Sequence, residues 1–156
     1  MTPPDNKIVP FQPQASRAAT VLVVDDEPGV RQLLTHWVNS LGYTSTAAGD
    51  AVAALDVMKS MPIDVAVCDI RMPGHDGFWL IDQIRTQSPA TAVIIATGLL
   101  DLAPEVTRQP GVAGCLTKPF DRRDLATALA HALVPGSPWV SSAGRPAIGL
   151  GDLPEM

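Results

Sequence analysis

Acidic, hydroxyl and amino side chains stand at the ends of four apolar runs in this chain of 156 residues. In chain order they are Asp25, Asp26 and Glu27, then Asp69, then Thr97, and finally Lys118, which Pro119 follows. Carboxylates gathered in a partly buried site repel one another, and a hard divalent cation such as Mg²⁺ offsets that repulsion. A carboxylate can also act as a nucleophile and form an aspartyl-phosphate. A metal, an ammonium and a hydroxyl group around a carboxylate are what phosphoryl transfer to it requires, so these residue types predict that chemistry.

Between residues 20 and 134, short apolar runs alternate with helical patterns. The runs predict five strands, at residues 20–25, 43–47, 64–69, 92–97 and 113–118. A helical stripe follows each run, and the fourth stripe (Leu99 to Val106) is cut short by Pro110 and Gly111. Five βα units predict an α/β fold, with helices on both faces of a parallel sheet. Because such sheets bind ligands at the carboxyl ends of their strands, we expect the polar residues to meet at one edge.

The composition is that of a globular protein, with 46% hydrophobic and 17% charged residues. A formal net charge of -5 disfavours a nucleic-acid surface, which needs clustered Lys and Arg. No apolar stretch has the length that predicts a membrane span. Residues 1–19 are Pro-rich and residues 135–156 are rich in Pro, Gly and Ser, so we expect flexible extensions around one domain at residues 20–134.

The two cysteines, Cys68 and Cys115, both fall in predicted strands and have no partner at metal-ligand spacing. We interpret them as reduced core residues, which is typical of a cytoplasmic protein. A redox-sensing role for Cys115 is the less favoured alternative.

The ordered set of motifs resembles the response-regulator receiver family of two-component signalling. The set consists of Asp25-Asp26, then Asp69 with the following IRMPGHDG (residues 70–77), then Thr97, then Lys118-Pro119-Phe120. The resemblance covers roughly residues 20–134. It implies a CheY-like (flavodoxin-like) fold of three layers, a doubly wound five-stranded parallel sheet in the order 2-1-3-4-5.

The resemblance also implies a magnesium site. Asp69 is the expected phosphoacceptor. Asp26, Asp69 and the backbone carbonyl of Arg71 are expected to bind Mg²⁺ directly, with Asp25 acting mainly through water.

The resemblance implies roles for three more positions. Lys118 is expected to pair with the phosphoryl oxygens and Thr97 to hydrogen-bond them. The Lys118–Pro119 peptide bond is expected to be cis, which is plausible because the second residue is proline. At the family's switch position, three residues before the lysine, this chain has Cys115 in place of an aromatic residue or histidine. A thiol cannot fill the space of a ring, so we expect phosphorylation at Asp69 without the usual switch.

Two further residues should affect the lifetime of a phosphoryl group. Arg71 and Leu99 are expected to flank the pocket and to slow the attack of water on it. Arg71 would occupy the route of the water, and Leu99 offers no polar group to orient it.

The resulting functional prediction is a single-domain response regulator. We expect it to receive a phosphoryl group from a histidine kinase or phosphotransfer protein. It would then signal to a downstream protein in trans, as a monomer or weak dimer, with no nucleic-acid or membrane ligand. The expectation that it stands alone rests on the 22 residues after Val134, too few for a DNA-binding module. We expect an acceptor rather than an enzyme, because haloacid-dehalogenase-type hydrolases need an acid where this chain has Arg71.

Simpler interpretations remain open for several of these features. Asp25 and Asp26 could be charges that favour a helix N-terminus. Thr97 could end its strand for reasons of β-propensity. The whole domain could also be a phosphorylation-independent interaction module, which Cys115 favours and the acidic site disfavours.

Overall fold

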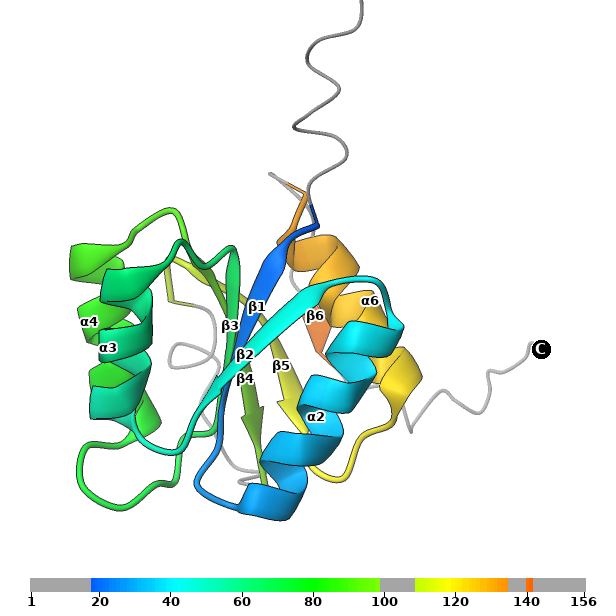
Figure 1. Cartoon of the computed structure of the whole chain (residues 1–156), viewed down its shortest axis with the longest axis horizontal. Coiled ribbons are helices and arrows are strands. Elements are labelled where there is room, and N and C mark those ends of the chain that lie inside the picture. The colour runs from blue at the N-terminus through cyan, green and yellow to red at the C-terminus, as the bar shows by residue number, and fades with distance from the viewer. Residues whose placement is uncertain (1–17, 99–108, 135–139, 142–156) are drawn as a thin grey trace, which may run out of the picture.

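The computed structural model describes residues 18–98, 109–134 and 140–141, in which strands and helices alternate (Figure 1). The strands are β1 (Thr20–Val24), β2 (Thr44–Ala48), β3 (Val65–Cys68), β4 (Ala92–Thr97), β5 (Val112–Thr117) and β6 (Val140–Ser141). The helices are α2 (Pro28–Ser40), α3 (Ala51–Ser60), α4 (Gly77–Gln87) and α6 (Arg122–Ala132).

All six strands form one parallel sheet in the order β2-β1-β3-β4-β5-β6. The first five follow the order 2-1-3-4-5, so the predicted doubly wound α/β fold is confirmed. Strand β1 lies in the sheet interior between β2 and β3, and all five of its residues are buried. The sheet therefore places the ends of β1 and β3 side by side.

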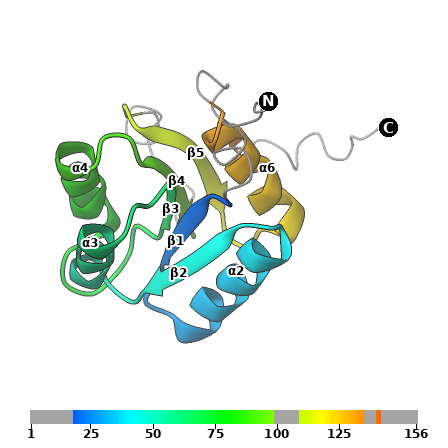
Figure 2. The ribbon, with the colours of Figure 1, turned by 45° about the horizontal axis from the view of Figure 1, so that its top comes forward.

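Helices cover both faces of the sheet, α3 and α4 on one side and α2 and α6 on the other (Figures 1 and 2). Alternate residues of β1 serve the two cores: Leu22 and Val24 join the cluster beneath α3 and α4, and Val21 and Val23 join the other. This burial on both faces explains why β1 is a continuous apolar run.

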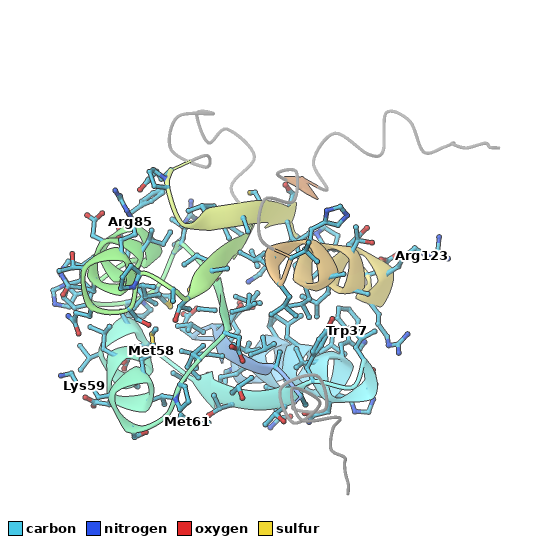
Figure 3. All side chains as sticks on the ribbon, turned by 90° about the horizontal axis from the view of Figure 1, so that it is seen from above. Trp37, Met58, Lys59, Met61, Arg85 and Arg123 are labelled. Carbon is cyan, nitrogen blue, oxygen red and sulfur yellow. The ribbon has the colours of Figure 1, made fainter. Side chains whose placement is uncertain are left out.

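On the second face, α2 and the segment that leads into α6 also touch through aromatic rings. Trp37 of α2 lies with its ring centroid 6.3 Å from that of Phe120, which precedes α6 (Figure 3 labels Trp37). Such tilted pairs add to the apolar burial between elements. The contact helps to hold the segment after Lys118 against the body of the domain.

Aspartates begin three of the helices in the described part of the chain. The carboxylates of Asp50, Asp76 and Asp121 each accept a backbone amide from the first turn of their helix. Helix α2 begins instead with Pro28, after Glu27 at the N-cap, and Glu27 makes no such side-chain bond. None of the described helices has the length and apolar character to cross a membrane.

Two predictions concern segments that the structure describes only in part or not at all. The helical stripe from Leu99 to Val106 lies outside them. Within the expected flexible extension at 135–156, Val140 and Ser141 form β6, paired in parallel with Gly114 and Cys115. The structure differs here because, among the described residues, β6 is the strand that covers the outer edge of β5. An extended segment can pair with such an edge without any periodic sequence pattern.

Candidate functional site

The carboxyl ends of four strands bring the predicted residues together at one edge of the sheet. Asp25 follows β1, Asp69 follows β3, Thr97 ends β4 and Lys118 follows β5. Backbone hydrogen bonds continue just beyond the strands. The Asp69 amide donates to the Val24 carbonyl at 3.0 Å, and the Lys118 amide donates to the Thr97 carbonyl at 2.8 Å. The fold thus fixes the spacing of these backbones before any ligand arrives.

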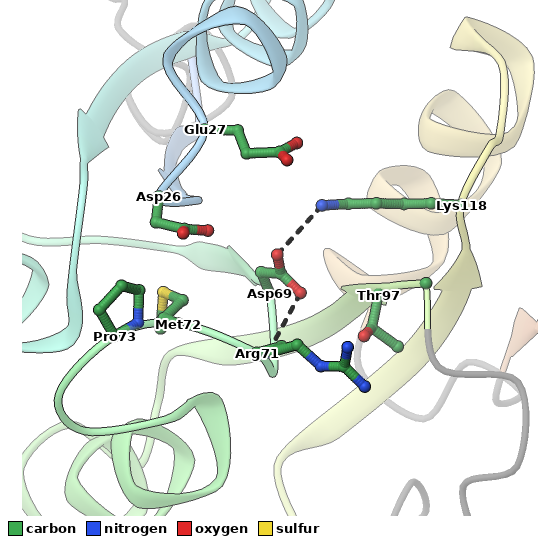
Figure 4. A pocket seen from close by; sticks show the side chains of 9 residues that line it. Asp26, Glu27, Asp69, Arg71, Met72, Pro73, Thr97 and Lys118 are labelled. Carbon is green, nitrogen blue, oxygen red and sulfur yellow. Dashed lines mark hydrogen bonds and ion pairs between the residues drawn. The ribbon is translucent and has the colours of Figure 1, made fainter.

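Lys118 joins two of the carboxylates. Its ammonium donates to Oδ2 of Asp25 at 2.7 Å and to Oδ2 of Asp69 at 3.1 Å, the second shown in Figure 4. The other oxygen of Asp25, Oδ1, accepts the amide of Glu27 at 2.9 Å, and Asp25 is only 1% exposed. Because Asp25 is buried and both of its oxygens have donors, the partly exposed Asp26 is better placed than Asp25 for direct metal coordination.

The surroundings of Lys118 favour its charged form. Burial disfavours the ammonium, but the hydrogen bond to Asp25, the charges of Asp69 and Asp25 and the bond to Asp69 outweigh burial and raise its pKa. Lys118 therefore keeps its positive charge at neutral pH. A fixed charge beside Asp69 is suited to stabilising an incoming anionic group.

Three carboxylates are close enough to share a cation. Asp25, Asp26 and Asp69 each offer an oxygen, and these oxygens lie within 4.8 Å of one another. An all-oxygen set suits Mg²⁺, which takes one or two carboxylates and keeps several waters. Asp26 is partly exposed, so water can reach such an ion. The residues present thus fit Mg²⁺, while the role of the Arg71 carbonyl stays a prediction.

An open pocket of about 580 Å³ lies over these residues (Figure 4). It is lined by Asp26, Glu27, Asp69, Arg71, Met72, Pro73, Thr97, Gly98 and Lys118. A water occupies about 30 Å³, so a phosphoryl group and a hydrated ion have room. Glu27 was expected at this edge of the sheet and Met72 lies within the IRMPGHDG motif, but neither was assigned a chemical role of its own. Leu99, predicted to flank this pocket, lies outside the described residues.

A glycine holds the loop after Asp69 against the start of α4. The Gly77 amide donates to the Ile70 carbonyl at 2.8 Å. A Cβ at position 77 would lie 2.3 Å from the backbone oxygen of Asp69 and 2.7 Å from Cα of Ile70. Only glycine therefore fits without moving the acceptor. Sequence reasoning missed this contact because a close approach of two backbone segments leaves no periodic pattern.

Two further contacts orient the aspartates. The Arg71 amide donates to Oδ1 of Asp69 at 3.3 Å, a long bond. The guanidinium of Arg31 in α2 donates from Nη1 to the backbone carbonyl of Asp25 at 2.7 Å. Arg31 was not predicted, because its residue type and helical position alone are those of an ordinary surface residue.

The predicted switch position lies within β5. Cys115 is 6% exposed and belongs to the core beneath α3 and α4, and burial raises the pKa of its thiol. It pairs in register with Ile95 of β4 on one side and Ser141 of β6 on the other. Further along the chain, the Lys118–Pro119 peptide bond is cis.

Comparison with known proteins identifies this arrangement. The sequence model of the response regulator receiver domain matches residues 21–130. The response regulator protein FleR of Pseudomonas aeruginosa is 39% identical over 125 residues, 77% of this chain but only 26% of FleR. The chain thus spans about a quarter of that relative.

Comparison with solved structures gives the same result as the sequence matches. The signal receiver domain of an HD domain-containing protein from Pseudomonas fluorescens Pf-5 superposes with a TM-score of 0.70 at 32% identity, covering 76% of this chain and 88% of that one. The response regulator TrrA of Thermotoga maritima, solved in complex with Mg(2+)-BeF, superposes at 0.65 with 26% identity, covering 74% of this chain and 99% of TrrA. With the strand order and the acidic edge described above, these matches show that the chain belongs to the response regulator receiver domain family.

Proposed function

We propose that Asp69 accepts a phosphoryl group in the presence of Mg²⁺ and that the phosphorylated form signals by binding a protein partner. The observation that carries the proposal is the Lys118 ammonium, which contacts both Asp25 and Asp69 while Asp26 lies within metal-sharing distance. Membership of the receiver family and the Mg(2+)-BeF complex of TrrA support it.

Each residue then has a chemical task. A carboxylate oxygen of Asp69 attacks the phosphorus of the donor, and the new O–P bond forms as the bond from phosphorus to the donor's leaving atom breaks. Lys118 shifts its pairing from the carboxylates to the phosphoryl oxygens, and the Thr97 hydroxyl donates to one of them. Mg²⁺, held by Asp26 and Asp69, would neutralise part of the charge on these oxygens.

The donor and the output belong to the same proposal. The donor is a phosphohistidine on a histidine kinase or a histidine phosphotransfer protein, as the family membership implies. The output is contact with a downstream protein in the cytoplasm, by a monomer or weak dimer. The chain acts as an acceptor whose phosphoryl group is later lost to water, and it does not turn over a metabolite.

Phosphorylation with acetyl phosphate tests the proposal. The intact mass is measured with and without Mg²⁺, with Asp69→Asn as the matched variant that lacks the nucleophilic carboxylate. We expect a gain of one phosphoryl group that needs both Mg²⁺ and Asp69. No gain, under conditions that modify a control receiver, would contradict the proposal and favour a phosphorylation-independent interaction module.

A further inference from the structure

The outer edge of β5 carries a strand from the C-terminal part of the same chain. Strand β6 pairs with Gly114 and Cys115, in the middle of the six-residue β5, and ends the sheet beside α6 (Figure 1). Two register pairs make few backbone hydrogen bonds, each of modest net strength. The contact is therefore specific in register but weak enough to be reversible.

The strand that β6 covers leads directly into the acceptor site. Lys118 follows the last residue of β5, and its ammonium bonds Asp25 and Asp69. Cys115, the register partner of Ser141, precedes Lys118 by three positions, about 10 Å along a strand. A change in the position of Lys118 can therefore be passed to β5, the strand with which β6 pairs.

The other side of β5 is held more firmly. Its pairing with β4 joins five register pairs and is followed by the Lys118 amide, which donates to the Thr97 carbonyl at 2.8 Å. Strand β4 itself pairs with β3 in the sheet interior. A shift of β5 is therefore more easily accommodated at β6 than at β4.

We propose that β6 is an intramolecular cap on the β5 edge, and that a phosphoryl group on Asp69 weakens its pairing. The second part of this proposal, the effect of a phosphoryl group on the β5–β6 pairing, rests on the proposed function. A phosphoryl group brings further negative charge beside Lys118, whose ammonium then turns from the two carboxylates to the new oxygens. Because the Lys118 backbone continues β5, the strand follows and the two-pair ladder to β6 loosens. Release leaves unpaired backbone groups at the edge, the kind of surface that pairs with another strand.

Hydrogen exchange tests the cap in the unphosphorylated full chain. The double variant Val140→Pro/Ser141→Pro removes both backbone amides, so the ladder breaks whichever one faces β5. The control Val140→Ile/Ser141→Thr keeps the amides and the β-propensity. We expect peptides spanning β5 to exchange about fivefold faster in the proline variant, and at the wild-type rate in the control. Equal exchange in all three proteins would overturn the cap.

Beryllofluoride with Mg²⁺ tests the coupling, as a stable analogue of the phosphoryl group. Linkage is reciprocal: a ligand that weakens the cap binds more tightly when the cap is already broken. We expect about fivefold tighter binding in the proline variant than in the control, the lower end of measured couplings. In the wild type, the same ligand should speed exchange in β5.

The outcomes of the beryllofluoride experiment distinguish a failure of the coupling between Asp69 and β6 from a failure of the proposed acceptor function. Equal binding by both variants, with a normal acceptor reaction, would overturn the coupling alone. No binding by any variant, alongside a control receiver that binds, would overturn the acceptor function and the coupling together. Cys68, which is 0% exposed, reports on folding, since its thiol should stay unreactive in every variant that keeps its core.

Discussion

At the residue scale, Lys118 sets the charge balance of the site. Lys118→Met removes the cation that offsets Asp25 and Asp69. We expect the rate of phosphorylation by acetyl phosphate to fall at least about tenfold, because no ammonium then stabilises the incoming group. Mg²⁺ affinity, measured by calorimetry, should rise by roughly tenfold, because a competing positive charge is gone.

The control for Lys118 is Lys59→Met, which removes an exposed lysine from the last turn of α3. It should leave both the phosphorylation rate and the Mg²⁺ affinity unchanged. An equal effect of the two variants on Mg²⁺ affinity would mean that only the net charge matters, against the local pairing described here.

Cys68 gives the stability a predictable pH dependence. Burial, together with the charge of Asp69, raises the pKa of its thiol from 9.0 to about 12. The folded state thus favours the neutral thiol, so its contribution is fully present below pH 9 and is lost as the pH rises towards 12. Between these values the unfolding free energy of the wild type should fall more steeply than that of Cys68→Ala, by up to about 1.4 kcal/mol per pH unit. Urea unfolding at pH 7.5, about 9.5 and about 10.5 measures the unfolding free energy of both proteins. An equal fall with pH in the wild type and in Cys68→Ala would refute the raised pKa of the Cys68 thiol.

At the scale of elements, the start of α4 determines where Asp69 lies. Gly77→Ala places a Cβ against the backbone of Asp69 and Ile70, neither of which is a flexible side-chain end. We expect a loss of roughly 2 kcal/mol of unfolding free energy, as for other overpacked sites, and slower phosphorylation.

Gly29→Ala in α2 is the matched control, because an added Cβ there meets nothing within 4 Å. It should leave phosphorylation unchanged and alter stability by no more than about 1 kcal/mol. Wild-type stability and activity in Gly77→Ala would show that the loop tolerates the side chain and would refute the proposed role of Gly77.

The elements also show what the sequence could and could not reveal. Continuous apolar runs predicted β1 and β3 because both faces of these strands are buried, and the residues that end them were then found by position alone. The contacts of Arg31 and Gly77 could not be predicted, since each depends on segments that meet only after folding. Strand β6 escaped prediction because two paired residues carry no periodicity.

At the scale of the whole molecule, the fold builds a cation site from segments far apart in the chain, so occupancy should stabilise the folded state. Mg²⁺ at ten times its dissociation constant should raise the unfolding free energy by about 1.4 kcal/mol. Asp26→Asn should remove most of this gain, and Asp56→Asn, on the exposed face of α3, should retain it. Urea unfolding in Mg²⁺ and in a chelator measures the effect, and a full gain in Asp26→Asn would place the ion elsewhere.

Chemical trapping can locate the phosphoryl group that we propose resides on Asp69. Borohydride reduces an acyl phosphate to an alcohol, so a phosphorylated aspartate becomes homoserine, which peptide mass spectrometry can assign to a position. After treatment with acetyl phosphate and Mg²⁺, we expect homoserine at position 69 and none in samples without Mg²⁺. Homoserine at Asp25 or Asp26, or a gain in intact mass with no trapped product at 69, would contradict the proposed acceptor role of Asp69.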